Sequence, residues 1–320
     1  MTNATRRYAI LGTGALGGFY GARLQRSGID VHFLLRSDYH HVCQHGLVIK
    51  SIAGDFELPH VHAYQDVAQM PPCDVVVVAL KTTQNHLLPQ LLPPVLKTDG
   101  VVLVLQNGLG VESDVAAIVG DDRVIGGLSF LCSNKIGPGT IHHLDYGSIN
   151  LGEFRPGYAP GGISDRLLQI AAEFRNAGIE ITCTDDLLLG RWKKLVWNIP
   201  YNGLSVVLDA RTDAIMKNPH SRQLVMDLMA EVVAGAASQN RYISDEFVQT
   251  MLTHTDQMKP YLTSMKLDFD SGRPLEVETI VGNPLRVANQ AGVALPKIAV
   301  LYQQLLFLDA RNRHKCVSSL

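Results

Sequence analysis

Three glycines near the start of the chain form the first pattern that could do chemistry. They stand in the stretch GTGALG, between an apolar run and a helical pattern. In such a turn the first glycine permits a tight bend, the second lets a pyrophosphate approach the backbone, and the third lets helix and strand pack closely. The helix N-terminus then faces the phosphates. The stretch predicts a dinucleotide site formed by Gly12, Thr13, Gly14, Ala15, Leu16 and Gly17.

The residue after the next apolar run indicates which dinucleotide binds. The run VHFLLRSD ends about 20 residues beyond the glycines, where an acidic residue usually binds the ribose hydroxyls, and here that place holds Arg36. A guanidinium pairs with a 2′-phosphate, which a carboxylate would repel. We therefore expect NADP(H) as the cofactor. The alternative is a solvated loop arginine that has no ligand.

Polar side chains also follow two further apolar runs. Lys81 and Gln84 come after DVVVVAL, and Asn107 stands in the stretch VVLVLQNG. Turn chemistry often places such residues after a strand, but open α/β sheets also bind their ligands beyond the carboxyl ends of the strands. We expect Lys81 to offset cofactor charge, Gln84 to contact the cofactor, and Asn107 to bridge cofactor and substrate.

A second polar pattern lies in the segment GRWKKLVWNIPYNGLSVV. Lys194, Asn198 and Asn202 are spaced by four, so on a helix they share one face. Pro200 lacks an N–H and is predicted to kink or end this helix. Polar side chains on an otherwise apolar face are costly unless they serve a polar site or cap a neighbouring element. Both interpretations remain open from the residues alone.

The elements that must position these residues divide the chain into two predicted domains. Residues 1–184 alternate strand-length apolar runs with helical patterns, which predicts an α/β fold with a Rossmann-like doubly wound parallel sheet. Residues 185–320 show helical periodicity throughout and predict an all-helical domain. Within it, Asn218 and Pro219 mark a helix start. The two domains are expected to pack around a cleft.

Composition limits the partners that we expect. The chain has 28 basic and 30 acidic residues and a net charge of −2, so nothing favours nucleic acid or an acidic membrane surface. The sequence lacks a signal-peptide pattern and an apolar run near the roughly 20 residues that span a bilayer, so we expect a cytoplasmic protein. Close histidine pairs lack the spacing of a catalytic zinc helix, and no metal is predicted.

Taken together, these motifs resemble those of the ketopantoate reductase (2-dehydropantoate 2-reductase) family. The resemblance rests on GTGALG, LKTTQ, LQNGLG, WKKLVWNIPYN and SMKLDFDSGRPLEVETIVG, which follow in family order over nearly the whole chain. It implies an NADPH-dependent reduction of 2-dehydropantoate to pantoate, a step of pantothenate biosynthesis. It also implies a role for each matching residue. The substrate-binding residues implied are Asn107, Asn198, Asn202 and Ser264, the catalytic residues are Lys194 and Glu276, and Lys81 is a cofactor contact.

The implied reaction suits these residue types. Hydride transfer to a 2-keto carbon develops negative charge on the oxygen, which the ammonium of Lys194 would stabilise and protonate. Its ordinary pKa of about 10.4 keeps a lysine charged unless burial is severe, and a nearby Glu276 would oppose the effect of burial. Asn198, Asn202 and Ser264 would hold the substrate hydroxyl and carboxylate. Glu276 would orient Lys194 or a substrate hydroxyl.

One departure leaves the substrate open. Some family members carry another substrate-contacting asparagine fourteen residues after the position of Asn198, where this chain has Thr212. The alternatives are therefore a reductase of another branched or aromatic 2-oxo acid, or a dinucleotide-sensing protein without catalysis. The sensor would need neither Lys194 nor Glu276. The sequence does not determine the oligomeric state, and a homodimer is among the states that it leaves open.

Overall fold

The computed structural model of the protein describes residues 6–317 and forms two compact units. The first holds the described residues up to Gln106 together with Val111–Leu187. The second holds Asn107–Gly110 and the described residues from Leu188 onward. The turn that carries Asn107 therefore belongs to the second unit, although its neighbours in the chain belong to the first.

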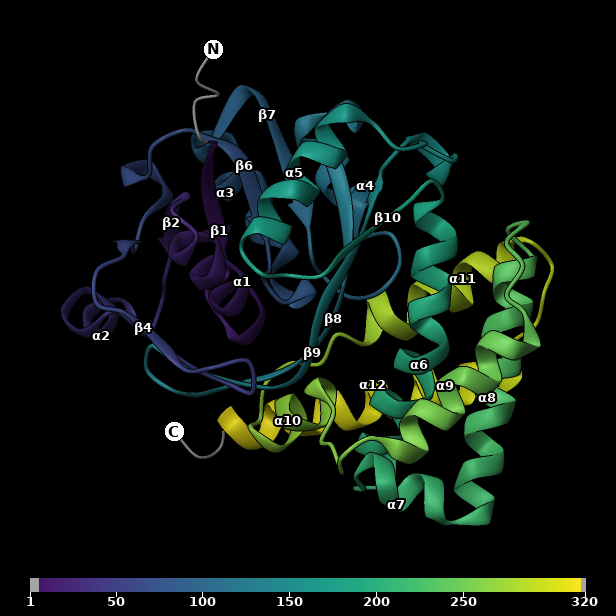
Figure 1. The fold of residues 1–320 in the computed structure, drawn as a ribbon. Coiled ribbons are helices and arrows are strands. Elements are labelled where there is room, and N and C mark those ends of the chain that lie inside the picture. Colours follow the sequence, from purple (N-terminus) through teal and green to yellow (C-terminus); the bar gives the residue numbers. More distant parts are fainter. Residues whose placement is uncertain (1–5, 318–320) are drawn as a thin grey trace. The chain divides into compact units, whose positions relative to one another are not determined.

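The first unit is built on one sheet, most of whose strands are labelled in Figure 1. The strands are β1 (Arg7–Leu11), β2 (Asp30–Leu34), β3 (Leu47–Ser51), β4 (Phe56–Leu58), β5 (His62–Tyr64), β6 (Cys73–Val78), β7 (Leu96–Val104), β8 (Val124–Gly137), β9 (Thr140–Glu153) and β10 (Ile181–Thr184). Their order in the described part of the chain is β4-β3-β9-β8-β7-β6-β1-β2-β5, with β10 beside β9. From β5 to β8 every neighbouring pair is parallel. The order reverses between β1 and β6, which is where doubly wound sheets bind ligands.

Helices cover both faces of this sheet because its central strands are apolar on both sides. In β1, Tyr8 and Ile10 join the core that includes α1 (Ala15–Arg26) and α5 (Asp165–Asn176). Ala9 and Leu11 join the other core, with α3 (Leu88–Val95) and α4 (Val111–Val119). The remaining helices of the unit are α2 (Tyr39–His45) and the short turns η1 (Val67–Gln69), η2 (Thr82–Leu87), η3 (Asp121–Arg123) and η4 (Pro156–Tyr158). The predicted doubly wound α/β fold is confirmed.

A long antiparallel hairpin was not anticipated from the sequence. Strands β8 and β9 have 14 residues each and pair antiparallel, and β3 pairs antiparallel with β4. The hairpin turns at Gly139, whose φ of 62° lies in the left-handed region. The sheet is therefore mixed at this edge, beyond the parallel part that carries the glycine loop.

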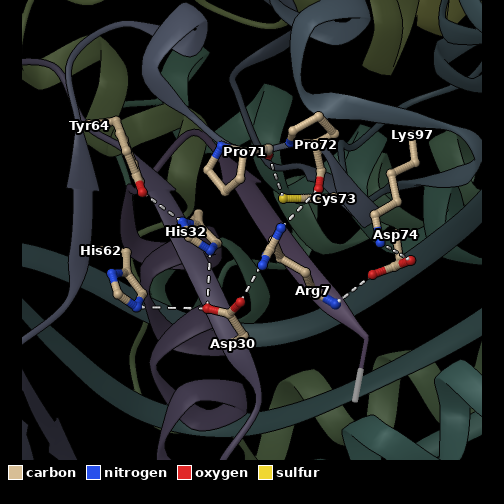
Figure 2. A network of polar contacts seen from close by, with 10 residues as sticks. All are labelled: Arg7, Asp30, His32, His62, Tyr64, Pro71, Pro72, Cys73, Asp74 and Lys97. Carbon is tan, nitrogen blue, oxygen red and sulfur yellow. Dashed lines mark hydrogen bonds and ion pairs between the residues drawn. The ribbon is translucent and has the colours of Figure 1, made fainter. Parts of the chain in front are cut away.

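A polar network links residues of five neighbouring strands (Figure 2). The Nε of Arg7 donates to Asp30 at 2.8 Å, and its backbone N–H donates to Asp74 at 2.8 Å. The Nε2 of His32 lies 3.1 Å from Asp30, its Nδ1 lies 2.9 Å from the hydroxyl of Tyr64, and its ring stacks on that of His62. Lys97 pairs with Asp74 at 2.7 Å. Arg7, Asp30, His62, Asp74 and Lys97 lie within the first two residues of their strands, whereas the glycine loop follows the other end of β1, so the network joins the opposite edge of the sheet.

The second unit is helical, as predicted. Its helices are α6 (Leu187–Val207), α7 (Thr212–Lys217), α8 (Pro219–Ala237), α9 (Asp245–Gln257), α10 (Ser264–Asp270), the π-helical turn η5 (Glu278–Gly282), α11 (Asn283–Gln290) and α12 (Pro296–Val317). The side chain of Asn218 caps α8 by accepting from His220 and Ser221, which confirms the predicted start. Close approaches need glycine: a Cβ at Gly203 would lie 2.6 Å from Leu301, and one at Gly235 would lie 2.9 Å from Trp192.

Pro200 was predicted to kink or end its helix, and it does not end it. Helix α6 continues through Pro200 to Val207. An internal proline costs about 3 kcal/mol, because it removes a backbone hydrogen bond and crowds the preceding turn. Here its neighbours Ile199 and Tyr201 are fully buried, and their burial offsets that cost. Asn202 consequently lies in the same helix as Lys194 and Asn198.

Candidate functional site

The glycine loop has the geometry that a pyrophosphate requires. Gly12 follows β1 with φ of 100°, and a Cβ there would lie 2.6 Å from the backbone nitrogen of Leu80. A Cβ on Gly17 would lie 2.4 Å from the carbonyl oxygen of Gly12. Gly14 differs, because within residues 6–317 no atom outside its own neighbourhood in the chain lies within 4 Å of the place of its Cβ. The first and third glycines are therefore needed for packing, while the second leaves open space at the N-terminus of α1. The residues present fit a dinucleotide.

The side chains predicted for the cofactor lie after adjacent parallel strands. Arg36 is exposed two residues beyond β2, and Lys81 is exposed three residues beyond β6, both strands being neighbours of β1. Gln84 is half-buried in η2, and its backbone N–H donates to the carbonyl of Lys81. The hydroxyl of Thr13 donates to the carbonyl of Leu34 at 2.9 Å, which ties the glycine loop to the end of β2. All of these belong to the first unit.

Gln106 is a buried polar residue beside the predicted cofactor residues that the sequence reasoning did not single out. It is buried just after β7, and its Nε2 donates to the carbonyl of Leu80 at 2.9 Å and to Asn85 Oδ1 at 2.7 Å. It thereby joins the end of β7 to the η2 turn that carries Lys81 and Gln84. A glutamine directly before an Asn-Gly turn was the only signal, and by itself it indicates no partner.

In the second unit, the polar face of α6 is buried as well as continuous. Lys194, Asn198 and Asn202 are 8%, 6% and 3% exposed. The Nδ2 of Asn198 is buried and has no hydrogen-bond partner in the described part of the chain. A buried donor without a partner costs about 1–3 kcal/mol, so an acceptor from a bound molecule would be stabilising there. Of the two interpretations left open by the sequence, this atom favours a binding site over a cap.

Opposing effects act on the pKa of Lys194. The pKa of its ammonium is lowered to about 7: burial lowers it most, the positive charge of Arg191 also lowers it, and the negative charge of Glu276 raises it. The expected opposition between burial and Glu276 is present, but burial outweighs it. Lys194 therefore exchanges its proton near neutral pH, as a group that must both give and regain a proton should.

Glu276 and Asn107 lie on segments that are joined to each other. The turn Asn107–Gly110 rests on the segment after Glu276: Leu109 N–H donates to the carbonyl of Thr279 at 2.8 Å, and Asn283 Nδ2 donates to the carbonyl of Leu109 at 2.6 Å. A Cβ on Gly108, whose φ is 98°, would lie 2.4 Å from the carbonyl oxygen of Thr279. Glycine at position 108 therefore allows the turn to pack this closely against η5.

Ser264 completes the set of predicted residues in the second unit. It is half-buried as the first residue of α10, directly after the N-cap Thr263. The second unit thus holds Lys194, Glu276 and every predicted substrate-binding residue, and the first unit holds every other predicted cofactor residue. In the described part of the chain no group of three or more His, Cys, Asp or Glu side chains could hold a metal ion. No helix of residues 6–317 is long and apolar enough to cross a membrane.

Comparison with known proteins assigns the family. The model of the ketopantoate reductase PanE/ApbA family matches residues 8–156, and the model of the C-terminal part of the same family matches residues 186–309. This chain belongs to the ketopantoate reductase family. It is 66% identical over 308 residues to a 2-dehydropantoate 2-reductase of Nostoc sp., covering 96% of this chain and 97% of that one.

Solved structures of ketopantoate reductases agree with this fold. A 2-dehydropantoate 2-reductase of Geobacter metallireducens is 46% identical, with a TM-score of 0.90, and the match covers 93% of this chain and 98% of that chain. One from Methylococcus capsulatus is 33% identical, with a TM-score of 0.85, covering 96% and 97%. The family that the sequence motifs indicated is therefore confirmed.

Proposed function

We propose that this protein is an NADPH-dependent reductase that converts 2-dehydropantoate to pantoate. The observation that carries the proposal is the buried face of α6, where a lysine with a pKa of about 7 stands one helical turn from an amide donor without a partner. Burying these polar groups destabilises the folded state unless they serve a binding site. An enzyme that must bind a polar substrate and protonate it needs such groups. Membership of the ketopantoate reductase family supplies the reaction class.

The first unit would hold the cofactor. The open space at Gly14 would admit the pyrophosphate to the N-terminus of α1, Arg36 would pair with the 2′-phosphate, and Lys81 would offset phosphate charge. Gln84 would contact the same molecule, and Asn107 would touch both cofactor and substrate. When bound, the reduced nicotinamide supplies the hydride that the 2-keto carbon accepts.

The second unit would hold the 2-oxo acid and manage the proton. Asn198, with its unpaired Nδ2, would donate to a substrate oxygen, and Asn202 and Ser264 would bind the remaining hydroxyl or carboxylate. Lys194 would give its Nζ proton to the keto oxygen as charge develops there, and would recover a proton from solvent after product release. Glu276 would keep Lys194 protonated, because its negative charge raises the lysine pKa.

Thr212 is the reason to consider a second class of substrate. Its side chain is fully buried and engaged with the backbone of Tyr261, so it presents no amide to a substrate. A pocket that differs at this point could accept another branched or aromatic 2-oxo acid. The proposed mechanism would be unchanged.

A panel assay tests these proposals directly. NADPH oxidation would be followed with 2-dehydropantoate, with 3-methyl-2-oxobutanoate, which lacks the hydroxymethyl group, and with phenylglyoxylate. We expect kcat/KM to be at least about 100-fold higher for 2-dehydropantoate, because a site built to bind a hydroxyl rejects analogues that lack it. A higher value for either analogue would identify the second substrate class. NADPH binding without oxidation of any substrate would instead indicate a sensor.

A further inference from the structure

A chain of buried hydrogen bonds links α10 to α6. The hydroxyls of Ser205 and Thr263 are 2.7 Å apart, and both residues are fully buried. Ser205 Oγ also donates to the carbonyl of Asn202 at 3.0 Å, and Thr263 Oγ1 accepts from the N–H of Lys266 at 3.2 Å. Because each hydroxyl has one proton, Thr263 must donate to Ser205 while Ser205 donates to Asn202. This series of hydrogen bonds runs from the first turn of α10 to the backbone of Asn202, a predicted substrate-binding residue.

A second contact holds the segment that leads into α10. Thr212 Oγ1 accepts from the N–H of Tyr261 at 3.2 Å, and the Thr212 N–H donates to the carbonyl of Tyr261 at 3.2 Å. Tyr261 stands three residues before Ser264. The approach to Ser264 is therefore held at two points, and the side chain of Thr212 serves this segment.

We propose that Ser205, Thr263 and Thr212 are positioning residues that set the place of Ser264 relative to the polar face of α6. The proposal rests on the proposed function, because it concerns how the same site recognises its 2-oxo acid. None of the three is assigned a contact with the substrate. Their effect passes through Ser264, which is adjacent to Thr263, while the carbonyl of Asn202 anchors the other end of the hydrogen-bonded series on α6. Losing one aligned hydrogen bond of this kind should weaken substrate binding by about tenfold.

The variants Ser205→Ala and Thr263→Val each remove one hydroxyl from the chain, and Thr263→Ser retains it. Because Thr263→Val also removes a helix cap, Ser244→Ala is the matched control: Ser244 caps α9 by accepting from Phe247 N–H at 3.2 Å, and among the described residues its hydroxyl has no hydrogen bond to α6. We expect Ser205→Ala and Thr263→Val to raise KM for 2-dehydropantoate about tenfold, with KM for NADPH unchanged. Thr263→Ser and Ser244→Ala should leave both KM values near those of the wild type.

The same substitutions in a Ser264→Ala background separate positioning from general loss of structure. If the series of hydrogen bonds acts through Ser264, Thr263→Val should raise KM for 2-dehydropantoate little further in the Ser264→Ala background. The reason is that the effects of substitutions at coupled residues are not additive. An unchanged tenfold effect in that background, or KM shifts no larger than those of Ser244→Ala, would overturn the proposal while leaving the proposed function intact. A wild-type enzyme that oxidises NADPH with none of the 2-oxo acids would overturn both.

Discussion

Lys194 is the residue on which the proposed chemistry depends most. We expect Lys194→Ala to lower kcat by about 100- to 1,000-fold, because the lost group acts on charge that appears mainly in the transition state. The dissociation constant for NADPH should hardly change, since the glycine loop, Arg36 and Lys81 belong to the other unit. Steady-state kinetics and a fluorescence titration of NADPH would measure the two quantities.

Lys193 is the matched control for this substitution. Its ammonium lies over the ring of Phe247, 5.3 Å from the centroid, and so faces α9. Lys193→Ala should retain most activity. Equal damage from the two substitutions would mean that Lys194 is not the proton donor.

The pH dependence of reduction should report the same lysine. Reduction needs the protonated form, and burial places the pKa of Lys194 at about 7. The value of kcat/KM for the 2-oxo acid should therefore be constant at low pH and fall about tenfold per pH unit above that pKa. Because the charge of Glu276 raises this pKa, Glu276→Gln should move the fall to lower pH. A shift to higher pH, or a flat profile in the wild type, would contradict the assignment.

Arg36 determines the choice of cofactor if it pairs with the 2′-phosphate. Replacing Arg36 with Asp exchanges attraction for repulsion at that phosphate, so KM for NADPH should rise far more than KM for NADH, by about 100-fold in their ratio. Both values come from initial rates with each cofactor. If both cofactors lost affinity equally, Arg36 would have another role.

At the scale of elements, two glycines of one loop should respond to alanine in opposite ways. Gly17→Ala would place a Cβ 2.4 Å from the carbonyl oxygen of Gly12 and should cost about 1–3 kcal/mol of unfolding free energy. Gly14→Ala meets no atom within 4 Å and should leave stability nearly unchanged. Gly14→Ala should nevertheless lower the affinity for NADPH by at least about tenfold, because the methyl group occupies the space for the pyrophosphate. Urea unfolding and NADPH titration of both variants test this contrast.

The elements that sequence reasoning predicted well are those whose ends depend on a single residue. Gly28, with φ of 94°, ends the first helix because only glycine adopts that backbone cheaply, and Pro219 begins α8 because its ring suits a first turn. The alternation of strand and helix around the glycine loop is likewise local. These signals are contained within a few neighbouring residues, so they could be recognised without a structure.

The elements that sequence reasoning missed depend on partners far along the chain. Helix α6 passes through Pro200 because its neighbours are buried, which no local propensity reveals. Gln106 matters through Leu80 and Asn85, and Thr212 matters through Tyr261. The site roles of Lys194, Glu276 and Ser264 were predictable only from family motifs and stay predictions. Their burial and the pKa of Lys194 required the structure.

At the scale of the whole molecule, the network in Figure 2 should make folding sensitive to acid. Burial holds the pKa of His32 below its ordinary value near 6.5, although Asp30 acts in the opposite direction. The unfolded chain therefore binds a proton more readily than the folded protein does. The stability due to neutral His32 is complete above pH 6.5 and is lost as the pH falls from there towards the folded pKa.

Urea unfolding between pH 7.5 and about pH 5 measures this sensitivity. The free energy of unfolding of the wild type should fall more steeply with acid than that of His32→Gln, which has no proton to gain. His220→Gln is the control, because this exposed histidine belongs to the other unit and should leave the slope near that of the wild type. Parallel slopes for the wild type and His32→Gln would contradict the role given to His32.

The four residues Asn107–Gly110 also bear on how such a chain could be recombined. They stand between β7 and α4 in the chain, yet their hydrogen bonds to Thr279 and Asn283 make them part of the helical unit. A chimaera that takes residues 1–187 from a relative therefore imports a piece of the other unit together with its cofactor domain. Exchange of the two units between family members should succeed only where the donor's turn matches the recipient's η5. The units are consequently expected to diverge together rather than as interchangeable modules.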